Sequence, residues 1–339
     1  MISVYNTFDP LKEVVLGDVD ISMINLQDGH KKKKIEYIFN QTKDDLKTFQ
    51  TLLESYDIKV RRPTTIPFSE IKTPYWSMAG TRIPISPRDL YLVLGDTIIE
   101  SAMCEPERFF ENFYFRDIIL DKFKDGARWL SMPMVRHNYN GTDWGGTDDQ
   151  IPNLDPIMDA PSVMKYGRDL FVNTIGAGNR LGLQWLEKHF GDAYDIHEIN
   201  NPMISGHLDS QINILRPGLI MTPYEPKLLP TYFKDWDFIN VSTDKDRSMA
   251  DTQELIDSRI QDGDFGNSNL VVNCLSIDTN TVVMFEHYKD QDKVIGELDN
   301  RGIRVLFTPM TNSHFFNQGV TCMTLELERH TPEKIIKYQ

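Results

Sequence analysis

The sequence lacks most of the features that assign a chain quickly to a class. It has three cysteines in 339 residues, without a CxxC pair or a Cys/His cluster, which excludes a disulfide framework and a structural zinc site. No stretch approaches the roughly 18 uninterrupted apolar residues of a membrane-spanning helix, and the first residues lack a basic region followed by an apolar run. We therefore expect a cytoplasmic chain with free thiols and no membrane partner.

Positive charge is also scarce. There are 36 Lys and Arg against 50 Asp and Glu, a net charge of −14 that repels phosphate backbones and excludes nucleic acid as the expected partner. The glycine-containing stretch at 176–182 lacks the spacing of a dinucleotide-binding loop. A small or cationic partner fits this composition better.

What the sequence does contain is alternating α/β patterning. With 40% hydrophobic and 25% charged residues, the composition is typical of a globular protein. Short apolar runs bounded by turn residues alternate with stretches of helical periodicity, and a strand, turn, strand, helix order recurs over ~50–70 residues. No Gly/Ser/Pro linker divides the chain, and the polar stretch 138–156 is predicted to be a long surface loop. The predicted strands are 13–17, 58–60, 91–99, 169–172, 214–222, 270–277, 281–285 and 305–308, and the predicted helices are 35–56, 182–190 and 291–300.

Cys322 follows a polar turn that contains glycine and opens an alternating run, CMTLEL, which reads as a strand. Its sulfur would then lie at the entrance of a strand, where a nucleophile could face a cavity. A lone cysteine is more often a buried core thiol, and we interpret Cys104 and Cys274 in that way.

His207 and Asp209 are two residues apart in HLDSQINIL. If this segment is a strand, both side chains lie on one face and bring an imidazole and a carboxylate to one pocket. The alternative is a surface histidine beside an aspartate. Asp169 and Asp89 each follow an arginine and precede an apolar run, a pattern that an exposed Arg-Asp pair would also give.

Taken together, these residues suggest a chemistry. A thiolate can attack an electrophilic carbon, a histidine can carry a proton to and from an amine, and carboxylates can bind a planar cation through paired hydrogen bonds. The set therefore points to a guanidinium substrate.

The sequence resembles the amidinotransferases, the family of arginine:glycine amidinotransferase and its relatives. The resemblance covers nearly the whole chain. It is carried by FDPLKEVVLG, PRDLYLVLGDTIIESAM, RFFENFYFRDII, GARWLSMP, YGRDLFVN, LGLQWLEKHF, HLDSQINILRPGLIM and GVTCMTLELER.

The resemblance implies a single catalytic domain over 1–339, folded as a five-bladed α/β propeller of ββαβ modules around a central channel. It implies that Cys322 is the nucleophile, His207 the general acid/base and Asp169 the carboxylate that orients the histidine. Asp89 and Asp209 would hold the guanidinium. No cofactor or metal is expected, since thiol, imidazole and carboxylates suffice, and family members are often dimers, which leaves a homodimer open.

The implied reaction moves the amidino group of arginine to Cys322 and then to an amine. The arginine that clamps the amino acid carboxylate in glycine amidinotransferase has no clear counterpart, because the aligned stretch reads Tyr224-Glu225-Pro226-Lys227. Gly206 also replaces a larger residue beside His207, so we expect an acceptor other than glycine. The unplaced candidates for a replacement clamp are Arg82, Arg128, Arg136 and Arg180. The serine and lysine that follow the substrate loop of glycine amidinotransferase fall on different residues here, near 266–268.

Two other interpretations remain at this point. In one, water takes the amidino group, as in arginine deiminase or an arginine dihydrolase. In the other, the propeller is a binding protein without catalysis, as in a ribosome anti-association factor.

Overall fold

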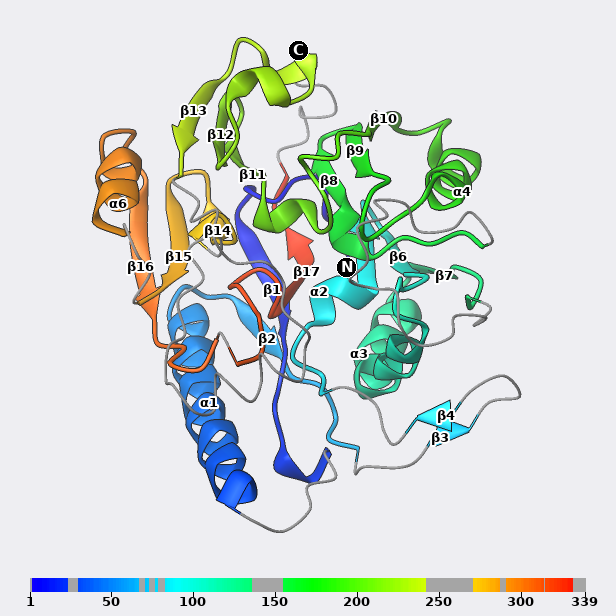
Figure 1. The fold of residues 1–339 in the computed structure, drawn as a ribbon, viewed down its shortest axis with the longest axis vertical. Helices are drawn as coiled ribbons and strands as arrows, with labels where there is room; N and C mark the ends of the chain where they lie inside the picture. The colour runs from blue at the N-terminus through cyan, green and yellow to red at the C-terminus, as the bar shows by residue number, and fades with distance from the viewer. Residues whose placement is uncertain are drawn as a thin grey trace.

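The protein is built from small sheets arranged around a common centre (Figure 1). The computed structural model describes residues 2–23, 30–66, 71–72, 77–78, 83–135, 155–241, 271–286, 291–313 and 315–331. Within them lie five three-stranded sheets and one two-stranded ribbon, β3 (Ile71–Lys72) with β4 (Ser77–Met78). This is the predicted five-bladed propeller.

Four of the sheets repeat one pattern. Two strands form an antiparallel hairpin, and a third strand then pairs in parallel with the second strand of the hairpin. A parallel neighbour requires a crossover connection, which explains the intervening helix or turns. The sheets are β5 (Tyr91–Leu94), β6 (Thr97–Glu100) and β7 (Arg128–Ser131); β8 (Val163–Tyr166), β9 (Asp169–Asn173) and β10 (Asp195–Ile199); β11 (Asn213–Arg216), β12 (Leu219–Thr222) and β13 (Asp237–Asn240); and β14 (Leu275–Asp278), β15 (Thr281–Phe285) and β16 (Arg304–Thr308).

The fifth sheet joins the two ends of the described chain. Strand β1 (Leu11–Leu16) pairs in parallel with β2 (Lys59–Arg61) and antiparallel with β17 (Thr324–Arg329). The last strand therefore occupies the place that the first hairpin strand has in the other sheets. Pairing the two ends in one sheet closes the ring.

Helices fill the crossovers. The long helix α1 (His30–Glu54) connects β1 to β2, α3 (Asn112–Lys124) connects β6 to β7, α4 (Arg180–Phe190) connects β9 to β10, and α6 (Gln291–Asp299) connects β15 to β16. Helix α4 begins where the Asn179 side chain accepts a hydrogen bond from the Gly182 N–H, a regular N-cap. The sheet of β11, β12 and β13 has two short 3₁₀ turns, η5 (Pro226–Leu228) and η6 (Thr231–Phe233), in place of a helix. Among the described residues, no helix is long and apolar enough to cross a membrane.

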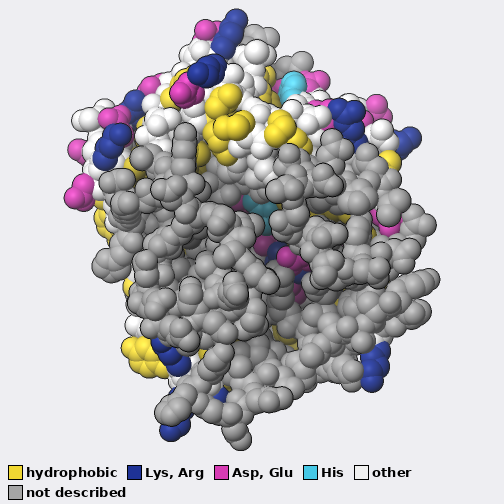
Figure 2. Space-filling view, viewed as in Figure 1, with side chains coloured by type: hydrophobic (Ala, Val, Ile, Leu, Met, Phe, Trp, Pro, Cys, Tyr) yellow, Lys and Arg dark blue, Asp and Glu magenta, His cyan; other side chains and the backbone are white. Residues whose placement is uncertain are grey.

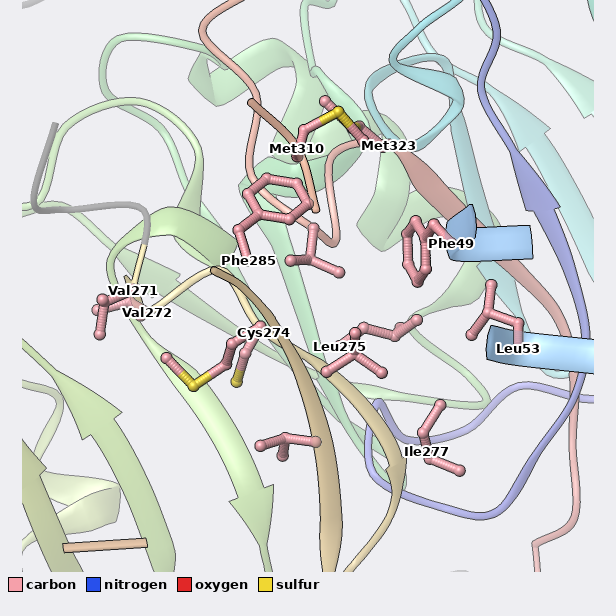
Figure 3. Packing of buried hydrophobic residues seen from close by; sticks show 14 of the residues in the cluster. Phe49, Leu53, Val271, Val272, Cys274, Leu275, Ile277, Phe285, Met310 and Met323 are labelled. Carbon is pink, nitrogen blue, oxygen red and sulfur yellow. The ribbon is translucent and has the colours of Figure 1, made fainter. Parts of the chain in front are cut away.

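Burial separates inner from outer strands. Every residue of β5, β6, β8, β12 and β15 is buried, whereas β7, β10, β13 and β16 are largely exposed or half-buried. The apolar hairpins thus form the inside of each blade. In Figure 3, Phe49 and Leu53 of α1 pack near Leu275 and Ile277 of β14, which joins the first blade to the last.

Most of the predicted elements are present with shifted ends. The predicted helices 35–56, 182–190 and 291–300 correspond to α1, α4 and α6. The strand expected to begin at Cys322 begins at Thr324 instead. Most of the loop predicted at 138–156 lies outside the described residues.

One buried ion pair links α3 to strand β1 of the sheet that joins the two ends of the described chain. Lys122 Nζ of α3 lies 2.6 Å from Glu13 Oε2 of β1, and both side chains are nearly inaccessible. Although burial opposes it, the hydrogen bonds from Lys122 and Arg61 hold the pKa of Glu13 below its usual range. Replacing Lys122 leaves a buried carboxylate with one partner fewer.

We predict that Lys122→Met lowers the free energy of unfolding by about 3 kcal/mol, measured by urea denaturation. Lys59→Met is the matched control, because exposed Lys59 pairs with the same carboxylate at 3.5 Å and should cost less than about 1 kcal/mol. Equal effects of the two substitutions would contradict the prediction.

Candidate active site

The first site residue, Asp89, comes from a short helix before β5. Helix α2 (Pro87–Leu90) is a single turn with proline at its first position, where a missing N–H costs nothing, and all four residues are buried. The Asp89 carboxylate is 4% exposed. Burial of an ionised group requires partners, and two cationic side chains supply them.

Arg108 is one partner. Its Nη1 donates to Asp89 Oδ2 at 2.9 Å. The second is His207, whose Nδ1 lies 3.6 Å from Asp89 Oδ1, beyond hydrogen-bond length but within ion-pair range.

His207 and Asp209 come from a turn before β11. The segment expected to be a strand forms a one-turn 3₁₀ helix, η4 (Leu208–Ser210), with His207 immediately before it. Gly206 has a φ of +86°, which L side chains rarely adopt, and its N–H donates to Ile175 O at 2.9 Å. The predicted strand was wrong. His207 and Asp209 nevertheless lie close to each other and to Asp89, since both aspartates raise the pKa of His207.

Cys322 lies in the turn before β17, and Asn273 holds that turn. The Asn273 Oδ1 atom accepts hydrogen bonds from the backbone N–H groups of Thr321 at 2.8 Å and Cys322 at 3.2 Å. Gly319 approaches so closely that a Cβ there would lie 2.2 Å from the same oxygen. The buried side-chain amide of Asn273 thus fixes the turn, and only glycine fits at position 319 beside it.

The carboxylate beside His207 is Asp159. Its Oδ2 accepts a hydrogen bond from His207 Nε2 at 2.9 Å. Asp159 precedes the one-turn helix η3 (Ala160–Ser162), which leads into β8, and is 2% exposed. Cys104 also points at it, because the Cys104 N–H donates to Oδ1 at 2.7 Å and the thiol lies 3.3 Å from Oδ2.

This arrangement corrects the expectation for Asp169. Asp169 Oδ1 accepts from His197 Nε2 at 2.6 Å, and its Oδ2 accepts from the Tyr232 hydroxyl at 3.0 Å. Asp169 opens β9, the second strand of its hairpin, and pairs with Tyr166 at the hairpin turn. It therefore lies at the opposite end of the sheet from Asp159 and His207.

The sequence reasoning missed Asp159, although a signal was present. The residue is an acid within the apolar stretch Ile157-Met158-Asp159-Ala160-Pro161. A carboxylate in such surroundings is costly to bury unless it is paired with a cation. Figure 2 shows where such charges gather, with histidine, acidic and basic side chains at the bottom of a depression near the middle of one face.

Comparison with known proteins relates the whole chain to one family of enzymes. No protein-family model matches the chain. Inosamine-phosphate amidinotransferase 1 of Streptomyces griseus is 29% identical over 357 residues, with 98% of each chain covered. Its solved structure superimposes with a TM-score of 0.80 at 27% identity, covering 100% of this chain and 99% of that one.

Two further relatives agree. SxtG, an amidinotransferase from Microseira wollei in the saxitoxin biosynthetic pathway, superimposes with a TM-score of 0.81 at 25% identity, with 98% of each chain covered. L-arginine:L-lysine amidinotransferase of Pseudomonas savastanoi pv. phaseolicola is 25% identical over 96% of this chain and 93% of its own. The chain belongs to the amidinotransferase family. It is an amidinotransferase by enzyme class, and its acceptor is a separate question.

The aspartates of the candidate site raise the pKa of both His207 and Cys322. Burial lowers the pKa of His207, but Asp89, Asp159 and Asp209 outweigh it and raise the pKa to about 9. Burial raises the pKa of the Cys322 thiol well above its usual range, Asp209 and Asp89 add to this, and the Gly319 N–H and Arg88 oppose it. At neutral pH without substrate, the site thus holds an imidazolium and a neutral thiol.

Neither a metal site nor a replacement clamp emerges from the described residues. No group of three His, Cys, Asp or Glu side chains in them could hold a metal ion. Arg180 pairs with Glu198 at 3.2 Å and is largely exposed, and Lys227 pairs with Glu225 at 2.6 Å. Arg128 is exposed on β7, whereas Arg82, Arg136 and residues 266–268 lie outside the described residues.

We predict that Asp159→Asn lowers kcat about 10²- to 10⁴-fold, because the neutral amide neither orients His207 nor stabilises its charged form. Asp169→Asn is the matched control and should keep its activity, with any cost falling on stability. The measurement is steady-state amidino transfer by both variants. A larger loss of kcat in Asp169→Asn than in Asp159→Asn would contradict the prediction and favour Asp169 as the partner of His207.

Stability should also depend on His207 ionisation. The folded pKa of about 9 is above the unfolded value of 6.5, so the contribution of His207 is complete below pH 6.5 and is lost as the pH rises through 9. The difference in unfolding free energy between wild type and His207→Gln, measured in urea, should therefore shrink from about pH 6 to about pH 10. A constant difference would contradict the assignment.

Proposed function

We propose that this amidinotransferase moves the amidino group of L-arginine to a primary amine other than glycine, through an intermediate on Cys322, with residues 1–339 acting as one catalytic domain. The main support is a pair of buried acceptors. Asp89 Oδ1 and Asp209 Oδ1 are inaccessible to solvent and accept no hydrogen bond from any residue that the structure describes. Buried anionic oxygens without donors are costly, and a guanidinium cation would supply the missing N–H groups.

Substrate binding also prepares the nucleophile. The thiol of Cys322 resists ionisation because it is buried beside Asp209 and Asp89. A guanidinium cation held by those carboxylates offsets their charge and lowers the pKa of the thiol, which then loses its proton to solvent. The nucleophile becomes reactive when its target is in place.

In the first half-reaction, the Cys322 thiolate forms a bond to the central guanidinium carbon. The bond from that carbon to Nε of arginine breaks, and the His207 imidazolium gives its proton to this nitrogen, which leaves as the side-chain amine of ornithine. Since Nε2 is held by Asp159, Nδ1 is the ring nitrogen that faces the substrate. Ornithine leaves, and the amidino group remains on sulfur.

In the second half-reaction, a neutral amine enters the vacated position. It loses a proton to the now neutral His207 and bonds to the amidino carbon, and the carbon-sulfur bond breaks to restore the thiolate. Arginine as donor is supported by the relative named L-arginine:L-lysine amidinotransferase. An acceptor other than glycine is supported by the sequence, which reads Tyr224-Glu225-Pro226-Lys227 where glycine amidinotransferase has the arginine that clamps the amino acid carboxylate.

The same intermediate could be hydrolysed, which would give citrulline. The full-length likeness to enzymes named as amidinotransferases, at 25–29% identity, favours transfer. That likeness and the retention of thiol, imidazole and carboxylates also weigh against a binding protein without catalysis.

We predict that wild type incubated with L-arginine and a panel of primary amines, including glycine, releases ornithine together with one guanidino product. Cys322→Ala should form neither, because no amidino-sulfur bond can form. With arginine alone, intact-protein mass spectrometry should show wild type heavier by one amidino group.

Circular dichroism of Cys322→Ala provides the control that the fold is intact. Full activity in that variant would sink the proposed intermediate. Citrulline formed as fast as any guanidino product would instead identify a hydrolase.

A further inference from the structure

Two buried arginines stand behind the two substrate carboxylates. Arg108 donates through Nη1 to Asp89 Oδ2 at 2.9 Å and through Nε and Nη2 to Glu111 at 3.0 and 3.1 Å. Arg88 brings Nε to 3.5 Å from Asp209 Oδ2, and its Nη1 donates to Glu326. Arg88 is 6% exposed and Arg108 is 7% exposed.

The pairing is similar on the two sides of the site, with a hydrogen bond of 2.9 Å on Asp89 and an ion pair of 3.5 Å on Asp209. On each aspartate, Oδ2 is occupied by the protein, and on Asp209 it also lies 3.4 Å from the Thr321 hydroxyl. On each, Oδ1 is buried and lacks a hydrogen-bond partner among the described residues. The protein thus leaves one acceptor oxygen open on each of the two carboxylates.

We propose that Arg88 and Arg108 are positioning residues that act through Asp209 and Asp89, fixing Oδ2 of each carboxylate so that the two Oδ1 atoms together select a planar cation with N–H groups on two nitrogens. This inference rests on the proposed function, in which these aspartates hold a guanidinium. It adds the arginines that set which oxygens the substrate meets.

Arginine is required in both places for a geometric reason. Each side chain bridges two carboxylates at once, Asp89 with Glu111 and Asp209 with Glu326. The planar guanidinium offers donors in fixed directions, whereas a lysine ammonium is a point charge on a flexible stem. Lysine would keep the charge and lose the orientation of the carboxylate.

Arg88 has a second effect, on the charge of Asp209. Burial raises the pKa of Asp209, and the negative charges of Asp89 and Glu326 add to this rise. The positive charges of Arg88 and His207 oppose it. The Cys322 thiol also lies near Asp209. Without Arg88 the pKa of Asp209 rises further. Guanidinium binding then weakens as the pH falls, because a protonated carboxyl no longer attracts the cation.

The test measures binding without turnover. Calorimetry on Cys322→Ala gives the Kd of L-arginine and of guanidinium chloride, and the second probe reports on the two carboxylates whatever the donor is. Adding Arg88→Gln or Arg108→Gln should raise both Kd values about 10- to 100-fold, the cost of losing a charge-assisted contact. Arg88→Lys and Arg108→Lys should fall between, and the loss in Arg88→Gln should deepen as the pH falls.

Lys122→Met in the same background is the matched control, because it breaks a buried ion pair away from the site and should leave both Kd values unchanged. Unchanged Kd values in folded Gln variants would overturn the inference, as would an equal loss in Lys122→Met. If a Gln variant fails to fold, the corresponding Lys variant tests the inference. A wild-type Kd in that Lys variant would show that the orientation of the carboxylate does not matter for binding, and would overturn the inference. Wild type and Cys322→Ala test the proposed function separately, through ornithine release and arginine binding.

Discussion

The structure depends on one constraint: the carboxylates buried at the centre of the propeller must each be paired with a cation. Asp159 has His207, Asp89 has Arg108, and Asp209 and Glu326 share Arg88. Desolvating such charges costs several kcal/mol each unless partners compensate. Among the described residues of this central group, Asp89 Oδ1 and Asp209 Oδ1 are buried and accept no hydrogen bond, which supports the proposal that a cationic ligand binds there.

The fold supplies these groups through its repeat. Asp89 precedes β5, Asp159 precedes β8, Asp209 precedes β11, Asn273 precedes β14 and Cys322 precedes β17. Each of these residues thus lies just before the first hairpin strand of a different blade. The residues are far apart in the sequence, but the repeated module brings one polar contribution from each blade to one place.

This repeat explains which parts of the site the sequence reveals. Cys322, His207, Asp89 and Asp209 were selected by residue type and by their position before an apolar run, and the structure clusters them. Asp169 has the same local pattern as Asp89, an Arg-Asp pair before a strand. The prediction for Asp169 is wrong because β9 is the second strand of an antiparallel hairpin, so the start of β9 lies at the far end of the sheet from the site. Hairpin register is a tertiary property, and local patterning does not encode which strand comes first.

A fixed pair of carboxylates can serve both proposed half-reactions because the ligand keeps its charge. The donor guanidinium, the amidino group on sulfur and the guanidino product are all cations, so Asp89 and Asp209 need not change ionisation between steps. The mobile charge is then the proton on His207, which the neighbouring carboxylates hold strongly enough to keep the ring charged at neutral pH. Release of that proton to the departing amine leaves a neutral imidazole beside three carboxylates, which favour its recharging. The same electrostatics that make His207 an acid toward ornithine therefore make it a base toward the incoming amine.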